Sequence, residues 1–379
     1  MTLDILEIDH GGDTQERSRA ATPRQVRAGI IDCDVHPTVR TPLDLKPYLA
    51  SRWWDHYEIY GLRPKHGMAT ADPYPKAQPR AARRDSWAPN GDQPGSNLAY
   101  MREHYLDPYA VEFGILSPLN PTGQGDQNID FSIAMTHAVN DWQLDVFTKP
   151  EKRFKASIVI PYEDGAASVR EIELRAKDKD FAQILILART AEPIGKRKYW
   201  PIFEAACQND LPVALHVFGY SGHPVSGTGW PSYYIEEMTG HSAACQAAVT
   251  SLAMEGVFEH FPTLKVIIIE GGFGWLPSLA WRLDKHWQRL RAEVPNVKRP
   301  PSEYLRQHLW ITTQPFEEPK DEAQLMDVMG WIGWDRLLFA TDYPHWDFDD
   351  PARVLPRGLA PEHKRMIEAE NARRLFNLG

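Results

Sequence analysis

Two carboxylates and an imidazole follow one another closely in the stretch GIIDCDVHP, residues 29–37. In an extended strand, residues two apart share one face, so the side chains of Asp34 and His36 point the same way. Carboxylate oxygens and imidazole nitrogens are ligands that divalent transition metals accept. The pair therefore predicts one side of a metal site at the end of a buried strand.

Three further apolar runs carry residues of the same chemical kind. His216 lies in LPVALHVF, Glu270 ends LKVIIIE, and Asp342 ends RLLFATD. Each has a structural explanation when taken alone, since a single strand histidine is often a hydrogen-bonded core residue and an Asp before Tyr-Pro can begin a turn. A buried glutamate without a partner is costly, and a bound cation would offset that cost. Four such strand ends together favour a metal centre.

Short apolar runs alternate with helical patterns along the chain, which is typical of repeated βα units. Because the strands of a closed (β/α)₈ barrel all deliver their carboxyl ends to one mouth, the residues above are expected to meet there. The expected strands are residues 29–36, 111–117, 156–161, 182–188, 212–218, 265–271, 309–313 and 337–342. The expected helices are residues 129–147, 163–177, 200–208, 232–259, 276–293 and 361–376.

Two segments fall outside this alternation. Residues 1–27 are polar and mixed in charge, and predict a flexible N-terminal tail before a single domain over residues 28–379. Residues 62–96 are rich in Pro, Arg and Gly and lack a steady apolar period, so they predict an inserted loop region after the first strand. This insertion is either a surface excursion, a lid over the barrel mouth or a subunit contact, because the loop after a barrel strand emerges on the catalytic face.

Composition narrows the class of protein. The chain has 379 residues, 42% of them hydrophobic, and a net charge of -9, which gives no reason to expect nucleic acid or an anionic membrane as a partner. No apolar run reaches the roughly 20 residues that a membrane helix needs. The three cysteines show no spacing typical of disulfide frameworks or thiolate zinc sites. We therefore expect a cytoplasmic protein that acts on a small molecule.

The order and spacing of these motifs resemble the amidohydrolase superfamily, in particular the branch that includes aminocarboxymuconate-semialdehyde decarboxylase and gamma-resorcylate decarboxylase. The resemblance runs from about residue 29 to the C-terminus, through Asp-x-His, His216, FEHFPTLKVIIIEGGFGWLP and LLFATDYPH. It implies a distorted (β/α)₈ TIM barrel of the α/β class with zinc, iron or manganese, one ion or two, at its mouth. The implied ligands are Asp34, His36, His216 and Asp342, and Asp342 would also be the general base that takes a proton from metal-bound water.

Two positions depart from the family pattern. The usual His-x-His or Glu-x-His is here Asp34-Val-His36, and the strand-six position that usually holds His is Glu270. In the decarboxylases that histidine is thought to protonate or orient the substrate, so its absence argues against decarboxylation. Glu270 could instead ligate the ion or bridge a second one. His241 and His345 are candidates for further ligands or catalytic groups, or for donors that orient carboxylates and substrate.

We therefore expect a metal-dependent hydrolase that cleaves a C–N, C–O or C–S acyl bond of a small carboxylate or aromatic substrate with metal-activated water. The alternative is a metal-dependent nonoxidative decarboxylase of an aromatic or unsaturated acid. A second alternative is a barrel that only binds a ligand. A homodimer is expected because related barrels pair near the mouth, where the Trp-rich segment Gly274–Arg291 would offer a surface.

Overall fold

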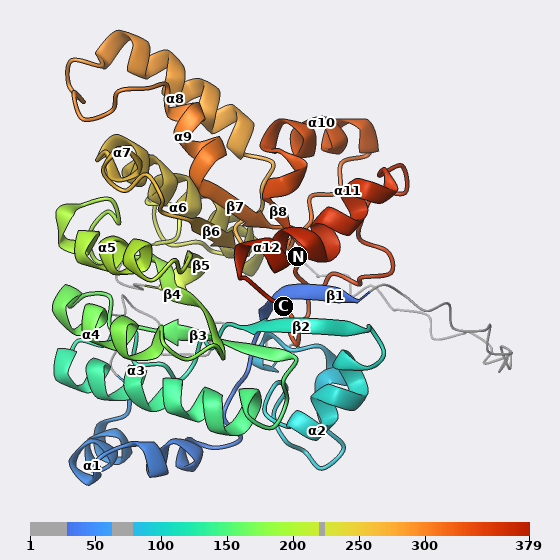
Figure 1. Ribbon diagram of the computed structural model, residues 1–379. Helices are drawn as coiled ribbons and strands as arrows, with labels where there is room; N and C mark the ends of the chain where they lie inside the picture. The colour runs from blue at the N-terminus through green and yellow to red at the C-terminus, as the bar shows by residue number, and fades with distance from the viewer. Residues whose placement is uncertain (1–28, 63–78, 220–223) are drawn as a thin grey trace, which may run out of the picture.

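Eight parallel β-strands form the centre of the fold in the computed structural model, which describes residues 29–62, 79–219 and 224–379. The strands are hydrogen-bonded in chain order from the first to the last (Figure 1). The predicted (β/α)₈ barrel of the α/β class is therefore confirmed. The strands are β1 Ile30–Val35, β2 Val111–Leu116, β3 Phe154–Val159, β4 Phe181–Arg189, β5 Val213–Gly219, β6 Val266–Ile269, β7 Leu309–Thr312 and β8 Leu337–Leu338.

Each apolar run singled out in the sequence overlaps one of these strands, with differences of one or two residues at the ends of β3, β4 and β5. The agreement follows from burial on both faces, since every residue of β1 and all but the last of β4 are buried against the core and the helices. The last strand is the shortest, because only Leu337 and Leu338 pair with β7. Residues 339–342 of the predicted strand continue beyond the ladder toward the mouth.

The barrel closes between β1 and the segment after β8 through separate hydrogen bonds and not through a continuous ladder. The amide of Cys33 donates to the carbonyl of Phe339 at 2.9 Å, and the amide of His36 donates to the carbonyl of Tyr343 at 2.8 Å. Val35 also forms an isolated parallel bridge with Tyr343. This seam places the ends of β1 and of the β8 segment next to each other.

Helices pack around the strands, and Figure 1 shows the first strand lying beside the C-terminal helices. The predicted helices are present, several of them as two consecutive pieces. The helices are α1 Ser51–Tyr60, α2 Leu98–Met101, α3 Ile129–Gln143, α4 Gly165–Arg175, α5 Trp200–Gln208, α6 Tyr234–Met254, α7 Val257–His260, α8 Leu276–Leu290, α9 Pro301–His308, α10 Glu322–Ile332, α11 Pro361–Arg365 and α12 Asn371–Leu375. None of the helices in the described ranges is long and apolar enough to cross a membrane.

Side-chain caps fix where two helices of the ring begin. The side chain of Asn128 accepts a hydrogen bond from the amide of Phe131 at 3.2 Å, at the start of α3. Asp164 does the same for Ala167 at 2.9 Å, at the start of α4. Each cap satisfies an amide that has no partner within the helix, which is why polar residues stand directly before these apolar segments.

The second half of the predicted insertion packs against the loop that follows β8. Ala82 forms an antiparallel bridge with His345, and the amide of Arg83 donates to the carbonyl of Pro344 at 3.0 Å. The amide of Trp346 donates to the carbonyl of Ala81 at 2.7 Å. Residues 79–96 therefore lie at the carboxyl ends of the strands. Residues 63–78 and the predicted tail over residues 1–27 lie outside the described residues.

Candidate metal centre and active site

Five residues that were predicted from the sequence as metal ligands meet at the carboxyl ends of four strands. Asp34 lies in β1 and His36 directly follows this strand, His216 lies in β5, Glu270 follows β6, and Asp342 follows β8. All five are buried, and His216, Asp34 and Asp342 have no exposed surface. The structure therefore brings together the residues that the sequence placed at separate strand ends, as side chains of one buried cluster.

Two imidazoles link the three carboxylates of this cluster, and both contact Asp34. His36 Nε2 lies 3.4 Å from Asp34 Oδ1 and 2.8 Å from Asp342 Oδ1. His216 Nε2 lies 3.5 Å from Asp34 Oδ2 and 3.2 Å from Glu270 Oε2. One nitrogen or oxygen from each of Asp34, His36, His216 and Glu270 lies within 4.8 Å of the others, which is a spacing that a single metal ion can span.

Backbone carbonyls fix the tautomer of both imidazoles. His36 Nδ1 lies 2.7 Å from the carbonyl oxygen of Ser117, and His216 Nδ1 lies 2.9 Å from that of Val217. A carbonyl oxygen can only accept, so Nδ1 carries the proton in both rings. Nε2 of each ring then faces the carboxylates, and its lone pair would be available to a metal ion bound there.

Several buried atoms of this cluster have no hydrogen-bond donor facing them. Among the described residues, both oxygens of Asp34, Nε2 of His36 and of His216, Oε2 of Glu270 and Oδ2 of Asp342 lack a hydrogen-bond partner. Buried polar atoms are nearly always paired, and unpaired acceptors that point at one another repel. A divalent cation satisfies all of them at once, so the residues present fit a metal ion.

The backbone is strained where two of these carboxylates leave their strands. Glu270 has a φ of 59° and Asp342 a φ of 63°, both in the left-handed region that non-glycine residues rarely adopt. Gly271 follows Glu270 in close contact with Cys245 and Ile268, where an added Cβ would lie 2.8 Å from the sulfur of Cys245. Such strain concentrates at functional sites, where it aims a side chain that a relaxed strand would point elsewhere.

Burial and charge act in opposite directions on the carboxylates. Burial tends to raise the pKa of Asp34, but the charges of His36 and His216 outweigh it and hold the pKa below its usual range. Burial raises the pKa of Glu270 well above its usual value, and the neighbouring carboxylates of Asp342 and others add to the shift. The cluster is therefore crowded with negative charge on the Glu270 side.

His345 is part of this centre, whereas His241 is not in contact with its carboxylates. His345 Nδ1 lies 2.6 Å from Asp342 Oδ1, and the His345 ring stacks on the His36 ring with centroids 4.4 Å apart. His241 lies on α6, is 3% exposed, and packs its ring edge-on to Phe218 at 4.8 Å. Burial lowers the pKa of His241 to about 3, so it is a neutral ring behind the site.

Two carboxylates that the sequence analysis did not select also belong to this region. Asp347 lies within 4.8 Å of ligand atoms of Glu270 and Asp342. Burial, followed by the charge of Asp342, raises the pKa of Asp347 to about 8. Asp32, in β1, hydrogen-bonds to Thr341 across the seam. The acidic run after DYPH was a signal for Asp347, but a run of acids alone does not reveal which carboxylate turns inward.

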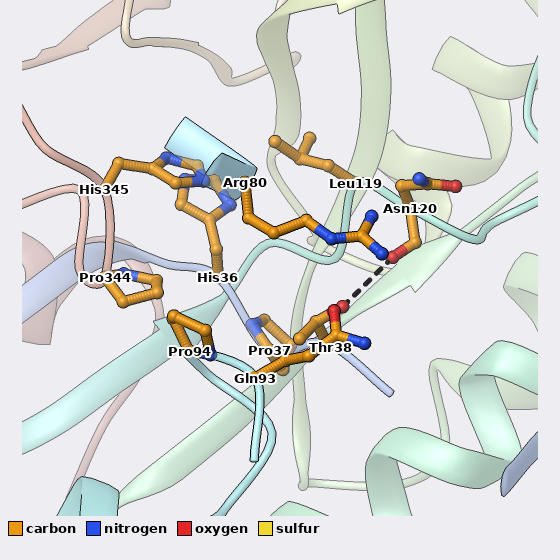
Figure 2. A pocket seen from close by; sticks show the side chains of 10 residues that line it. All are labelled: His36, Pro37, Thr38, Arg80, Gln93, Pro94, Leu119, Asn120, Pro344 and His345. Carbon is orange, nitrogen blue, oxygen red and sulfur yellow. Dashed lines mark hydrogen bonds between the residues drawn. The ribbon is translucent and has the colours of Figure 1, made fainter. Parts of the chain in front are cut away.

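A cavity opens beside His36 and His345, and part of the insertion lines it. Figure 2 shows Arg80 extending past the two imidazole rings toward Asn120. Trp87, which also belongs to the insertion, does not line this cavity. The lining residues are His36, Pro37, Thr38, Arg80, Gln93, Pro94, Leu119, Asn120, Pro344 and His345.

Comparisons with known proteins identify relatives of this chain. The sequence profile of the family described as Amidohydrolase matches residues 31–378. A gamma-resorcylate decarboxylase from Polaromonas sp. is 26% identical over 73% of this chain and 86% of its own length. The corresponding enzyme from a Rhizobium species is 28% identical over 72% of this chain and 85% of its own length.

Solved structures share the fold over nearly the whole chain. A dihydroxybenzoic acid decarboxylase from Polaromonas sp., solved with bound manganese and 2-nitroresorcinol, is 22% identical, with a TM-score of 0.64 over 93% of this chain and 98% of that one. A 5-carboxyvanillate decarboxylase from Novosphingobium aromaticivorans with bound manganese is 19% identical, with a TM-score of 0.71 over 92% and 97%.

The expectation of a hydrolase is therefore wrong, because the relatives that align over most of both chains are decarboxylases. The ligand set could not separate the two reactions, since an ion held by imidazoles and carboxylates polarises a substrate oxygen in either case. The prediction of hydrolysis gave too much weight to the residue type at one position, Glu270. A different side chain at the same barrel mouth can donate the proton to the reacting carbon.

Proposed function

Because this chain belongs to the amidohydrolase family, we propose that it is a metal-dependent nonoxidative decarboxylase of a hydroxylated aromatic acid or a related unsaturated acid. The observation that carries the proposal is the alignment with gamma-resorcylate decarboxylases over most of both chains. The buried cluster of two imidazoles and several carboxylates supports it, because these atoms fit a divalent ion.

The reaction needs a proton donor and a place for an anion. The bond between the carboxylate carbon and the rest of the substrate breaks, CO₂ leaves, and the electron pair that stays on the substrate carbon takes up a proton. The side chains therefore have to hold an acidic substrate with its carboxylate beside the centre and deliver one proton to the carbon behind it.

We assign the proton delivery to His345. Its Nδ1 is held by Asp342, so a proton on Nε2 is free to leave toward the cavity that His345 lines. A carboxylate that orients an imidazole in this way also stabilises its protonated form. Asp342 would then both bind the metal and orient His345. His241 supports the site indirectly, by packing on Phe218.

Arg80 supplies positive charge at the cavity. Its guanidinium is the charged group of the insertion among the lining residues, and it extends over the opening (Figure 2). A guanidinium binds a carboxylate with two parallel hydrogen bonds, which would orient an anionic substrate. We therefore propose that residues 79–96 of the 62–96 insertion act as a substrate-binding flap of the single barrel domain.

We propose manganese as the ion, because two solved relatives hold it and because a site rich in carboxylates suits it. Asp34, His36, His216, Glu270 and Asp342 are the side chains that would hold it. When bound, the ion would polarise the oxygens of the substrate and offset its negative charge. The predictions of a homodimer and of a cytoplasmic location stay predictions. Trp281 on α8 is 60% exposed and is available to such a dimer contact.

The test is release of CO₂ by the full-length protein loaded with Mn²⁺. A panel of benzoic acids with hydroxyl groups next to the carboxylate, and of unsaturated dicarboxylic acids, is incubated with the protein and the gas is measured. We expect metal-dependent release from at least one hydroxylated acid, and loss of it in His216→Ala. Release of an amine or alcohol from acyl substrates by the same preparation, without CO₂ from any acid, would overturn the proposal.

A further inference from the structure

A glutamate from one loop holds the neighbouring loop that begins after Glu270. Residues 271–275 join β6 to α8, and Glu317 lies in the segment that joins β7 to α10. The amides of Phe273 and Gly274 both donate to Glu317 Oε1, each at 2.8 Å. One carboxylate oxygen therefore ties two loops of the barrel mouth together.

The loop after Glu270 is also held at two other points. The indole Nε1 of Trp275 donates to the carbonyl of Gly271 at 2.9 Å, which curls the loop back on its own start. The ring of Phe273 is fully buried and packs edge-on to Phe316, the residue before Glu317, with centroids 5.4 Å apart. Because its residues are fixed to one another, a shift of the Glu317 carboxylate would move the backbone of the whole loop.

The Glu317 carboxylate depends on these amides because it is removed from water. Burial raises the pKa of Glu317, and the hydrogen bonds from Gly274 and Phe273 oppose that shift. Its second oxygen, Oε2, is buried and has no hydrogen-bond partner among the described residues. Gly272 leaves room for the carboxylate, since an added Cβ there would lie 2.8 Å from Oε1. The charged group is therefore stable only where the loop presents both amides to it.

Glu270 is held by β7 on one side and by this loop on the other. Its amide donates to the hydroxyl of Thr312 at 3.1 Å. Its φ of 59° lies in the left-handed region, which a glutamate keeps only when the surrounding backbone is fixed. Phe273 follows three positions later, so its hydrogen bond to Glu317 acts on the backbone that sets the direction of the Glu270 side chain.

We propose that Glu317 is a positioning residue of the metal centre, which holds the Glu270 carboxylate in place through the loop between them. The inference rests on the metal centre of the proposed function. The side chain of Glu317 accepts hydrogen bonds from the loop and not from a proposed ligand. It therefore acts on a bound ion through the backbone of the loop and through Glu270.

The test measures Mn²⁺ affinity in Glu317→Leu, which removes the acceptor of both amides. The full-length protein is stripped with a chelator and titrated with Mn²⁺, and the free ion is measured by electron paramagnetic resonance. We expect the affinity to fall on the order of 10–100-fold, as for other residues that orient a metal ligand. Glu317→Gln keeps an acceptor oxygen for the two amides and should bind Mn²⁺ with an affinity close to that of the wild type. Glu318→Leu makes the same change at the exposed neighbour and should bind Mn²⁺ like the wild type.

A double-mutant cycle with Glu270→Gln separates positioning from a general loss of stability. If Glu317 acts through Glu270, Glu317→Leu should change the Mn²⁺ affinity little once Glu270 has been replaced. Losses of affinity that simply add overturn the proposal, and so does wild-type affinity in Glu317→Leu.

Gly274→Ala is the second variant, for the case that Glu317→Leu does not fold. Its added Cβ would lie 3.2 Å from Glu317 Oε1 and so push that carboxylate aside. We expect a smaller loss of Mn²⁺ affinity in this variant, and an unchanged affinity contradicts the proposal. Because Mn²⁺ affinity is measured without CO₂ release, the positioning role and the decarboxylase activity can fail separately.

Discussion

Asp32 and Thr341 are joined by two hydrogen bonds across the seam where the barrel closes. The amide of Thr341 donates to Asp32 Oδ1 at 3.0 Å, and its hydroxyl donates to Asp32 Oδ2 at 2.5 Å. Asp32 Oδ1 also accepts from the amide of Asp34, and Oδ2 from the hydroxyl of Tyr105. One carboxylate thus holds the backbone of a β1 ligand and of the residue before Asp342.

We expect Asp32→Asn to weaken both the fold and the metal centre. An amide would turn an NH₂ group toward donors that now face an oxygen, and leaving buried donors unpaired costs roughly 1–3 kcal/mol of unfolding free energy. Urea unfolding and Mn²⁺ titration measure the two effects. Thr341→Ser keeps both hydrogen bonds and serves as the control. Wild-type metal affinity in Asp32→Asn would show that the seam does not position the ligands.

His345→Gln should separate proton delivery from metal binding. Glutamine removes the titrating ring while keeping a polar side chain, so we expect kcat for CO₂ release to fall on the order of 10²–10⁴-fold. The manganese content should stay at the wild-type value, because His345 contacts the centre through Asp342. His286→Gln, on the exposed face of α8, is the control. Loss of metal in His345→Gln would instead identify His345 as a ligand.

The sequence was sufficient to predict the barrel because most strand residues are buried on both faces, so that the strands read as nearly continuous apolar runs. It was also sufficient to select candidate ligands at four strand ends that the fold brings together, since residues such as Glu270 are difficult to explain as core. Four helices, α1, α2, α9 and α10, were not predicted. The first of them, SRWWDHYEIY, buries only Trp54, so its apolar pattern is weak.

Local patterns could not predict the parts of the site that depend on tertiary contacts. Asp347 lies in a stretch with other acids, and only the turn after β8 directs it toward Glu270. The residues around Asp32 do not reveal its structural role, because its partner Thr341 lies 309 positions away in the sequence. The reaction was predicted wrongly because a ligand set specifies an ion and not the bond that breaks.

We expect the carboxylate of Glu171, on α4, to make the free energy of unfolding decrease at acidic pH. Its carboxylate accepts hydrogen bonds from Asn140 at 2.9 Å and from Arg175 at 2.7 Å, and it lies 2.9 Å from His137 Nδ1. Burial alone would raise its pKa, but hydrogen bonds from His137 and Arg175 outweigh burial and lower the pKa to about 2.

The direction of this pH dependence follows from the difference between the pKa of Glu171 in the folded and in the unfolded chain. The unfolded chain, in which the pKa of Glu171 is near its usual value of about 4.3, binds the proton first, so this contribution is complete above that pH and is lost as the pH falls toward 2. We expect the carboxylate to contribute roughly 2–3 kcal/mol to the loss of unfolding free energy in acid, measured by urea unfolding. Glu171→Gln should lose less stability over the same range, and equal losses in both proteins would contradict the prediction.

Gly95 should be required for the position of His36. Its φ is +76°, and an added Cβ would lie 2.2 Å from the carbonyl oxygen of His36. Gly91 has a similar φ of +86° but no atom within 4 Å of an added Cβ, so Gly91→Ala introduces the backbone strain without the clash. That strain costs roughly 1–2 kcal/mol of unfolding free energy. Gly95→Ala should cost more than Gly91→Ala and should also weaken Mn²⁺ binding, because the clash displaces a ligand. Thermal unfolding and metal titration of the pair give the comparison, and equal metal affinity in the two variants would mean that the flap does not hold His36 in place.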